Sequence, residues 1–202
     1  MTINTENLLN SILESLDRID YIKLSDIPNI DLYMDQITTF MDSRLRSSMR
    51  NPGEDKVLTK TMINNYAKND LLPPPVKKKY SKEHVLLLIF IYYYKGVLSI
   101  NDIQTLLEPI TDAFFDKKED FCLEDVYQEV FEMEKGQIQR LKEDVIRKYE
   151  LSETTFEDAP EENQEFLRQF AFVCLLSFDV YLKRLMIEKI VDGMREGKKD
   201  KK

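Results

Sequence analysis

Apolar residues recur at helical spacing along most of the chain, with little of the apolar–polar alternation that is typical of strands. The segments with the helical pattern are 4–20, 31–45, 58–69, 81–95, 100–107, 119–150 and about 162–193. The segment 81–95 is apolar almost all round, so we expect it to be the buried, central helix of the core. The pattern predicts an all-α fold, a helical bundle with at most a tiny β-hairpin around 71–80.

Local signals mark some of the boundaries between these helices. Ser99 and Asp102 form a pattern like a capping box at the start of the helix 100–107. Pro109 is expected to stop that helix, because proline lacks the N–H donor that the next turn needs. Gly136 predicts a bend or a helix end within the segment that follows.

Residues 58–80 (LTKTMINNYAKNDLLPPPVKKKY) combine a short polar-faced helix with a stiff basic loop. Thr59 and Thr61 are candidate N-terminal caps of the helix, which is expected over 58–69. The triple proline must end it, since the residue before a proline is pushed out of helical geometry. Three consecutive lysines, 77–79, follow the prolines.

A polar helix face next to a lysine loop is a pattern suited to nucleic acid, because polar side chains can face bases while lysines lie on phosphates. The candidate nucleic-acid-binding residues are Lys60, Thr61, Asn64, Asn65, Tyr66, Lys68, Lys77, Lys78 and Lys79. Composition alone favours the other interpretation, a surface helix with a solvated lysine run.

Charge is distributed unevenly along the chain. The formal net charge is −8, which argues against general binding of polyanions. Between Arg44 and Lys82, however, there are ten Lys and Arg residues against three Asp and Glu residues. A basic patch on an acidic body can bind a phosphate backbone locally while the remainder repels DNA.

The order of these parts resembles the DNA-binding domain of MerR-type regulators. The matching residues are Tyr66, Leu71, Leu72, Pro73, Tyr80 and Ser81, and the later LSINDIQTLL is similar to the next helix of that family. The resemblance implies a winged helix-turn-helix, with a recognition helix over 58–69 and a basic wing over 73–80. The chain has Thr61 and Asn64 where such proteins often carry arginines, and Asp70 where they have glycine.

A more specific resemblance covers roughly Asp31 to Ile110. The run TKTMINNYAKNDLLPPPVKKKYSKEH is similar to a family of uncharacterised bacterial proteins that share a domain of unknown function. This resemblance implies no activity.

The sequence suggests four consecutive regions. They are an N-terminal amphipathic helix at 1–30, the MerR-like winged-helix head at 31–110, a helical C-terminal region at 111–195 and a disordered tail at 196–202.

The last long helix predicts a homodimer, because apolar residues encircle most of it and need cover on nearly every side. These residues are Phe166, Phe170, Val173, Leu176, Phe178, Tyr181, Leu182 and Leu185. MerR-type proteins also pair through helices that follow the head. The competing interpretation is that the helices at 81–95 and 119–150 cover this helix within one chain.

Residues with catalytic or metal-binding patterns are scarce. His84 is the only histidine, and Cys122 and Cys174 form no CxxC pattern, so we expect two buried free thiols. We expect no catalytic residue, no enzyme activity, no cofactor and no metal site. No apolar run reaches the length of a membrane span, and the closest candidate, FAFVCLLSF, is short and flanked by Arg168 and Asp179. No signal peptide is recognisable, so we expect a cytoplasmic protein.

Two functional interpretations from different classes remain. The first is a DNA-binding transcriptional regulator that reads double-stranded DNA with a winged helix-turn-helix. The alternative is a helical protein–protein interaction module without DNA binding, which uses the same surface for a protein partner.

Overall fold

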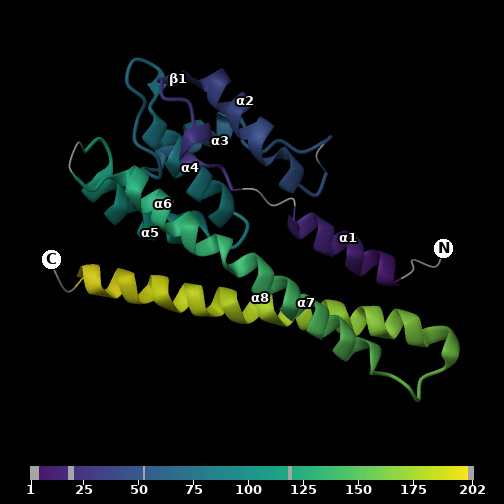
Figure 1. Ribbon diagram of the computed structural model, residues 1–202. Coiled ribbons are helices and arrows are strands. Elements are labelled where there is room, and N and C mark those ends of the chain that lie inside the picture. Colours follow the sequence, from purple (N-terminus) through teal and green to yellow (C-terminus); the bar gives the residue numbers. More distant parts are fainter. Residues whose placement is uncertain (1–4, 18–20, 52, 118–119, 200–202) are drawn as a thin grey trace. The chain divides into compact units, whose positions relative to one another are not determined.

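The computed structural model describes residues 5–17, 21–51, 53–117 and 120–199, and helices dominate this part of the chain (Figure 1). The α-helices are α1 (Thr5–Asp17), α2 (Met34–Leu45), α3 (Lys60–Lys68), α4 (Lys82–Tyr94), α5 (Ile100–Phe114), α6 (Leu123–Lys135), α7 (Gln137–Glu153) and α8 (Glu161–Lys199). Short 3₁₀ turns are found at Leu24–Asp26 and Arg46–Ser48. Within the described ranges the only sheet is an antiparallel pair, β1 (Leu32–Tyr33) with β2 (Lys79–Tyr80). The predicted all-α fold with a minimal strand element is confirmed.

The chain divides into two compact units. One contains residues 1–20 and 131–187, and the other contains residues 21–130 and 188–202. The helices α6 and α8 therefore contribute residues to both units.

The core of the unit formed by 21–130 and 188–202 is built on α4. Every residue of α4 from His84 to Ile91 is buried, as expected for a helix that is apolar all round. The ring of Phe90 meets the ring of Tyr127 edge to face, with centroids 5.6 Å apart. The hydroxyl of Tyr127 donates a hydrogen bond of 2.6 Å to the carbonyl of Ile22, and burial raises the pKa of this tyrosine.

The helix α5 begins as predicted but ends later. Ser99 and Asp102 form the expected capping box, with Ser99 N–H donating to Asp102 Oδ2 over 3.1 Å. The prediction that Pro109 stops the helix is wrong, because α5 continues to Phe114. A proline removes the hydrogen bond that its own N–H would make and its ring crowds the carbonyl four residues earlier, but the hydrogen bonds of the turns on either side can still form, so the helix can continue.

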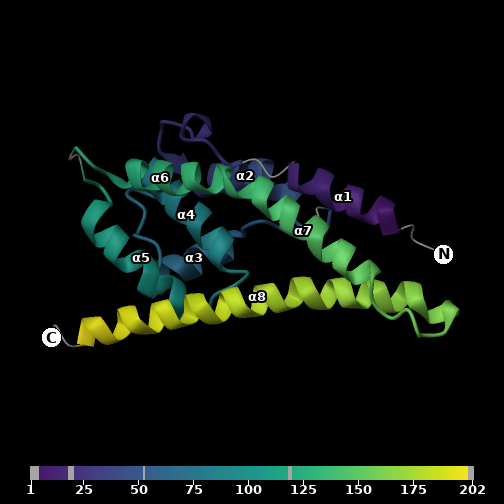
Figure 2. The same cartoon turned by 60° about the horizontal axis from the view of Figure 1, so that its bottom comes forward.

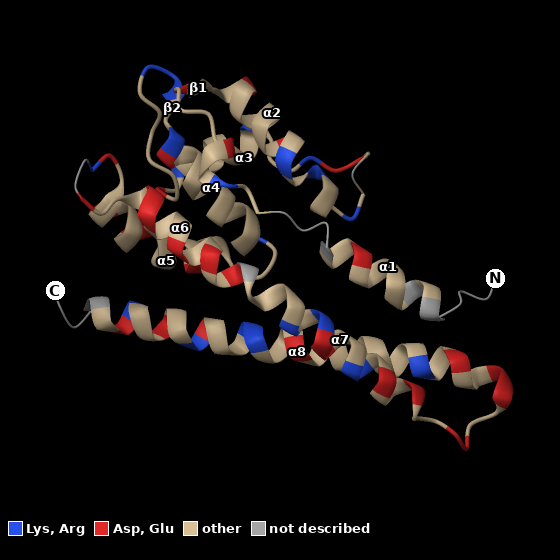
Figure 3. Ribbon diagram, in the orientation of Figure 1, with Lys and Arg blue, Asp and Glu red and all other residues tan. Residues whose placement is uncertain are grey.

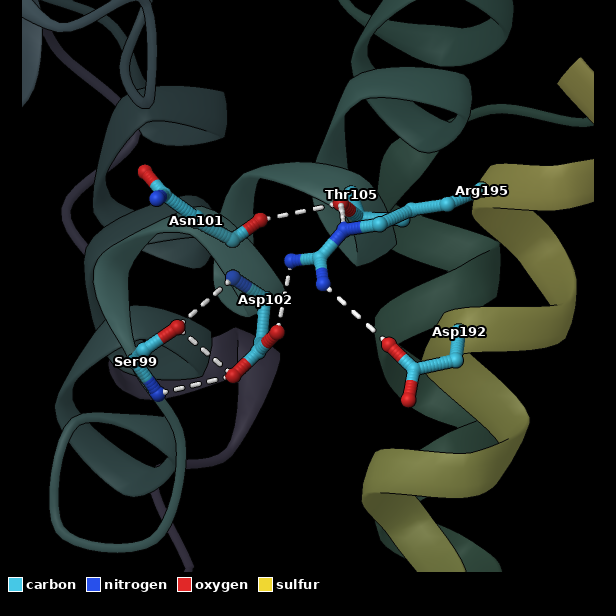
Figure 4. Close-up of polar contacts among 6 residues, drawn as sticks. All are labelled: Ser99, Asn101, Asp102, Thr105, Asp192 and Arg195. Atoms are coloured by element: carbon cyan, nitrogen blue, oxygen red, sulfur yellow. Dashed lines mark hydrogen bonds and ion pairs between the residues drawn. The ribbon is translucent and has the colours of Figure 1, made fainter. Parts of the chain in front are cut away.

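Asp102 also forms an ion pair with Arg195, which lies near the C-terminal end of α8 (Figure 4). Nη2 of Arg195 lies 2.6 Å from Asp102 Oδ1, and its Nε donates to the hydroxyl of Thr105 over 3.1 Å. The hydrogen bond from the Ser99 hydroxyl and the Arg195 guanidinium lower the pKa of Asp102. The last turns of α8 are thereby tied to the start of α5.

The unit formed by 1–20 and 131–187 contains α1, α7 and the first part of α8. The two helices α7 and α8 run side by side in it (Figures 1 and 2). The ring of Tyr149 meets the buried ring of Phe172 edge to face at 5.6 Å, and Nζ of Lys148 lies 2.6 Å from Oδ2 of Asp179. Leu9 joins Tyr149 and Phe172 around a small cavity of about 30 Å³.

Two features of α8 differ from the sequence predictions. Cys174 is exposed rather than buried, whereas Cys122 is half-buried with its Sγ 3.1 Å from Asp125 Oδ2. The helix extends to Lys199, so residues 196–199 of the predicted disordered tail are helical. The rest of that tail, 200–202, lies outside the described residues.

His84 caps the start of α4 from a buried position. Its Nδ1 accepts a hydrogen bond of 3.0 Å from Ser81 N–H, and its ring is 3% exposed between the rings of Tyr80 and Phe115. Its Nε2 has no hydrogen-bond partner among the described residues. Burial lowers the pKa of His84, although the carbonyls of Pro73 and Pro74 and the carboxylates of Asp31 and Asp116 oppose this shift.

We expect the free energy of unfolding to fall as the pH drops below about 6.5, the ordinary histidine pKa. The unfolded chain then binds a proton that buried His84 accepts only at lower pH, so acid favours unfolding. Protonation of Nδ1 also removes the acceptor for Ser81 N–H. In His84→Gln the side chain can still cap the helix but does not titrate. Chemical denaturation at several pH values should show a flatter pH dependence for this variant, and parallel curves would contradict the assignment.

Candidate nucleic-acid interface

The start of α3 is fixed by one of the two predicted caps. Oγ1 of Thr59 accepts a hydrogen bond of 3.1 Å from Met62 N–H, so Thr59 is the N-cap and Thr61 lies within the first turn. The helix spans Lys60–Lys68 rather than 58–69. Leu58 lies before the helix and is buried there, which explains why its apolar side chain fits the helical pattern without belonging to the helix.

The helix α3 has one buried face and one polar face. Ile63 and Tyr66 point into the core with exposed fractions of 0% and 5%. The exposed candidate residues share the opposite face, because their spacing of three and four residues places them on one side of a helix. They are Thr61, Asn64, Asn65 and Lys68.

Tyr66 differs from the other candidate residues because its side chain belongs to the core. Burial raises the pKa of its hydroxyl. Its backbone carbonyl has a structural role, since it accepts hydrogen bonds from the N–H groups of Leu71 at 2.9 Å and Leu72 at 3.3 Å. Asp70, between the helix and these leucines, has a φ of 53°, a left-handed conformation that glycine adopts most easily.

The basic loop is a tight β-hairpin. Val76 and Lys79 exchange two backbone hydrogen bonds, of 3.0 and 2.9 Å. Lys77 and Lys78 occupy the two central positions with φ values of 50° and 65°. Two successive positive φ values in a two-residue hairpin define a type I′ turn, which Asn-Gly sequences normally form. Two lysines in this turn are an unusual and strained choice.

The hairpin is attached to the segment before α2. Tyr80 pairs with Leu32 and Lys79 pairs with Tyr33 in the β1–β2 ladder. The sequence predicts a tiny strand pair within 71–80, and the Val76–Lys79 bridge lies there, but the partner of β2 comes from a different part of the chain. Two-residue strands carry no periodic pattern, so β1 had no recognisable signal.

The three lysines of the loop differ in their surroundings. Lys77 and Lys78 are exposed at the tip, whereas Lys79 is half-buried and its ammonium lies 5.3 Å from the centroid of the Tyr33 ring. Figure 3 shows this basic loop projecting beside β1 and β2. Tyr33, which is 53% exposed, is a surface residue of the site that sequence reasoning missed.

A groove of about 470 Å³ lies between α2 and the start of α3. It is lined by Thr38, Thr39, Asp42, Arg46, Lys56, Leu58, Thr59, Lys60 and Thr61. Arg46 and Lys56 add two basic residues to the candidate set, and the only sequence signal for them was their place in the basic stretch. Arg46 Nε donates to Asp42 Oδ2 over 2.8 Å, and Lys60 forms an ion pair with Asp35.

The described residues contain no group of three or more His, Cys, Asp or Glu side chains that could hold a metal ion. In the same part of the chain, no helix combines the length and the hydrophobicity that crossing a bilayer requires.

Comparison with curated proteins and with solved structures finds no match. A family model described as "Domain of unknown function (DUF1836)" matches residues 22–130, which is more than half of the chain. The match includes all of α2 to α5 and the whole candidate interface. The predicted relationship to a family with a domain of unknown function is therefore confirmed, and the chain belongs to the DUF1836 family.

Proposed function

We propose that this protein is a transcriptional regulator that binds double-stranded DNA through a MerR-like winged helix-turn-helix. In this proposal α3 is the recognition helix and residues 73–80 are the wing. The observation that carries the proposal is the exposed Lys77–Lys78 pair, held at the tip of a tight hairpin that residues 69–75 join to a helix with a polar outer face. One helix and one basic loop on the same anchor can contact a major groove and the adjacent phosphates together.

The outer face of α3 has the chemistry of a helix that reads bases. Asn64 and Asn65 are exposed, and an asparagine amide can make two hydrogen bonds to adenine in the major groove. Thr61 offers a hydroxyl and a methyl group, and Lys68 a cation at the end of the same face. The short side chains of Thr61, Asn64 and Asn65 favour a close approach of the helix to the base edges.

The basic residues around the groove between α2 and α3 are suited to phosphate. Lys60 is paired with Asp35, but both side chains are more than half exposed, and such surface pairs contribute about 0–1 kcal/mol. Lys60 can therefore exchange this partner for a phosphate at little cost. Lys56 lines the same groove, next to the first turn of α3, where the positive end of the helix dipole also favours an anion.

A bacterial cytoplasm is the setting that fits this proposal. Cys122 and Cys174 are both free thiols, which is the usual state of cysteines in a reducing compartment.

A protein partner on the same surface is the alternative function, and the wing supplies an observation in its favour. Val76 at the hairpin is 70% exposed and Tyr33 beside it is 53% exposed. Exposed aromatic and aliphatic side chains are more typical of protein contacts than of phosphate contacts. Binding to random duplex DNA and its dependence on salt separate the two functions.

We expect Lys77→Gln/Lys78→Gln to weaken binding to random duplex DNA and to flatten its salt dependence. Each lysine on a phosphate contributes about 0.9 to the slope of log affinity against log salt, so the slope should fall by about 1.8. Fluorescence anisotropy with a labelled duplex at several salt concentrations measures this. The matched control, Lys183→Gln/Lys189→Gln, removes the same charge from α8 and should bind like the parent. No binding at low salt, or an unchanged slope in the wing variant, would favour the protein partner.

We expect Asn64→Ala to change sequence preference rather than general affinity. Losing a good bidentate contact should reduce discrimination between preferred and other sites by about 1–3 kcal/mol. Selection from a random duplex pool, followed by titration of the selected site, measures the difference. Asn163→Ala, at an exposed asparagine of α8, serves as the control. Equal preferences for Asn64→Ala and the parent would remove Asn64 from the proposed reading face.

We expect Lys77→Asn/Lys78→Gly to stabilise the protein while weakening DNA binding. Asparagine and glycine relieve the positive φ values of the type I′ turn, which should raise the free energy of unfolding by about 1 kcal/mol. Urea denaturation measures the gain. Lys77→Gln/Lys78→Gln keeps the strain and removes only the charge, so it should unfold like the parent. A destabilised Asn-Gly variant would mean that the turn is not limited by its backbone conformation.

A further inference from the structure

The outer face of α8 between residues 166 and 185 is an exposed apolar stripe. Its large members are Phe166, Phe170, Val173, Phe178, Tyr181 and Leu185, with exposed fractions between 38% and 68%. Their spacing of three to five residues keeps them on one side of the helix. The rings of Phe166 and Phe170 stack on each other, as do those of Phe178 and Tyr181. The stripe therefore spans about five helical turns, with one stacked ring pair towards each end.

The opposite side of the same helix segment is the side that packs on α7. Phe172 is buried against Tyr149, and Asp179 holds Lys148. Phe172 and Asp179 lie roughly half a helical turn around from the centre of the stripe, because each residue advances the helix by about 100°. The contacts that α8 makes with α7 therefore leave the stripe uncovered.

The positions of the apolar residues in the stripe are symmetric about its midpoint. Phe166 and Leu185, Phe170 and Tyr181, and Val173 and Phe178 lie at equal distances on either side of a midpoint between Leu175 and Leu176. Cys174 and Ser177, both exposed, flank this midpoint on the same side of the helix. An antiparallel twofold pair requires a surface that meets its own reversed copy, and every position of this stripe has an apolar side chain at its symmetric position.

We infer that α8 pairs antiparallel with α8 of a second copy of this chain, about a twofold axis at this midpoint. Phe170 then lies at the level of the partner's Tyr181, and Phe166 at the level of the partner's Leu185. Cys174 and the partner's Cys174 lie one helical turn apart across the axis, on the same side of the pair. This register is a property of α8 alone and does not depend on the proposed DNA binding.

The exposed area of the stripe is close to the area that one partner buries in a stable dimer. Four aromatic side chains, each of roughly 200 Å² and more than half exposed, together with Val173 and Leu185, offer roughly 700 Å² per copy. A standard stable interface buries about 800 Å² per partner. Exposed apolar patches of this size are uncommon on the surfaces of proteins that stay monomeric.

The oligomeric state of the full chain tests the inference. Sedimentation equilibrium at micromolar concentration should show twice the chain mass of 24.0 kDa. Phe170→Glu and Tyr181→Glu should each give the single-chain mass, with unchanged helical circular dichroism. The control Lys183→Glu also introduces a glutamate on α8, but outside the stripe, and should remain dimeric. A single-chain mass for the parent at tens of micromolar, or dimers that survive Phe170→Glu, would overturn the inference.

Cross-linking tests the register. In a Cys122→Ser background, mild oxidation should link Cys174 to the partner's Cys174 and give a dimer band on a non-reducing gel. In a Cys122→Ser/Cys174→Ser background, Phe166→Cys alone should give no link, whereas a mixture with Leu185→Cys should link the two variants. Efficient self-linking of Phe166→Cys would show parallel helices instead and overturn the antiparallel register.

Both cross-linking and sedimentation are carried out without DNA. A chain that dimerises in this register but fails to bind duplex DNA leaves the inference intact and removes only the proposed function. A chain that binds DNA as a monomer leaves the proposed function intact and overturns the inferred dimer.

Discussion

The burial of Leu71 and Leu72 holds the candidate interface together. Their side chains are 2% and 1% exposed, and both of their N–H groups donate to the carbonyl of Tyr66. Burying one leucine contributes roughly 1.5–3 kcal/mol, whereas an exposed ion pair contributes about 0–1 kcal/mol. The positions of the lysines therefore depend on apolar packing far more than on any charge–charge contact. The three prolines extend this anchor, because their fixed φ angles leave the chain little freedom before the hairpin turns.

The hairpin turn, in contrast, is a feature that destabilises the fold. Lys77 and Lys78 both have positive φ values, which asparagine and glycine would adopt without strain. The ladder between β1 and β2 and the burial of Tyr80 hold the turn in this conformation. Strain of this kind at an exposed position is common where a side chain serves function rather than folding.

Features set by strong local physics were predictable from the sequence, and features set by distant partners were not. The buried helix α4, the Thr59 cap and the Ser99–Asp102 capping box follow from apolar runs and from side chains that bond within four residues. The pairing of β2 with residues 32–33 depends on tertiary placement that no local pattern encodes. Pro109 misled the prediction because proline disfavours a helix interior without forbidding it. Within the site, the polar face of α3 could be predicted from the spacing of its residues. The ion pair between Lys60 and Asp35 and the contact between Lys79 and Tyr33 could not, because each joins residues that are far apart in the sequence.

The tie between Arg195 and Asp102 bears on where the DUF1836 fold ends. Sequence similarity to the family stops at residue 130, yet Val191 is completely buried and Arg195 reaches the start of α5, both within the unit built on α4. A fragment cut at the limits of the family match would lose these two residues and leave apolar surface and a carboxylate without the cover they have in the full chain. The family boundary is thus a limit of shared sequence, while the compact unit built on α4 includes a segment about sixty residues further along.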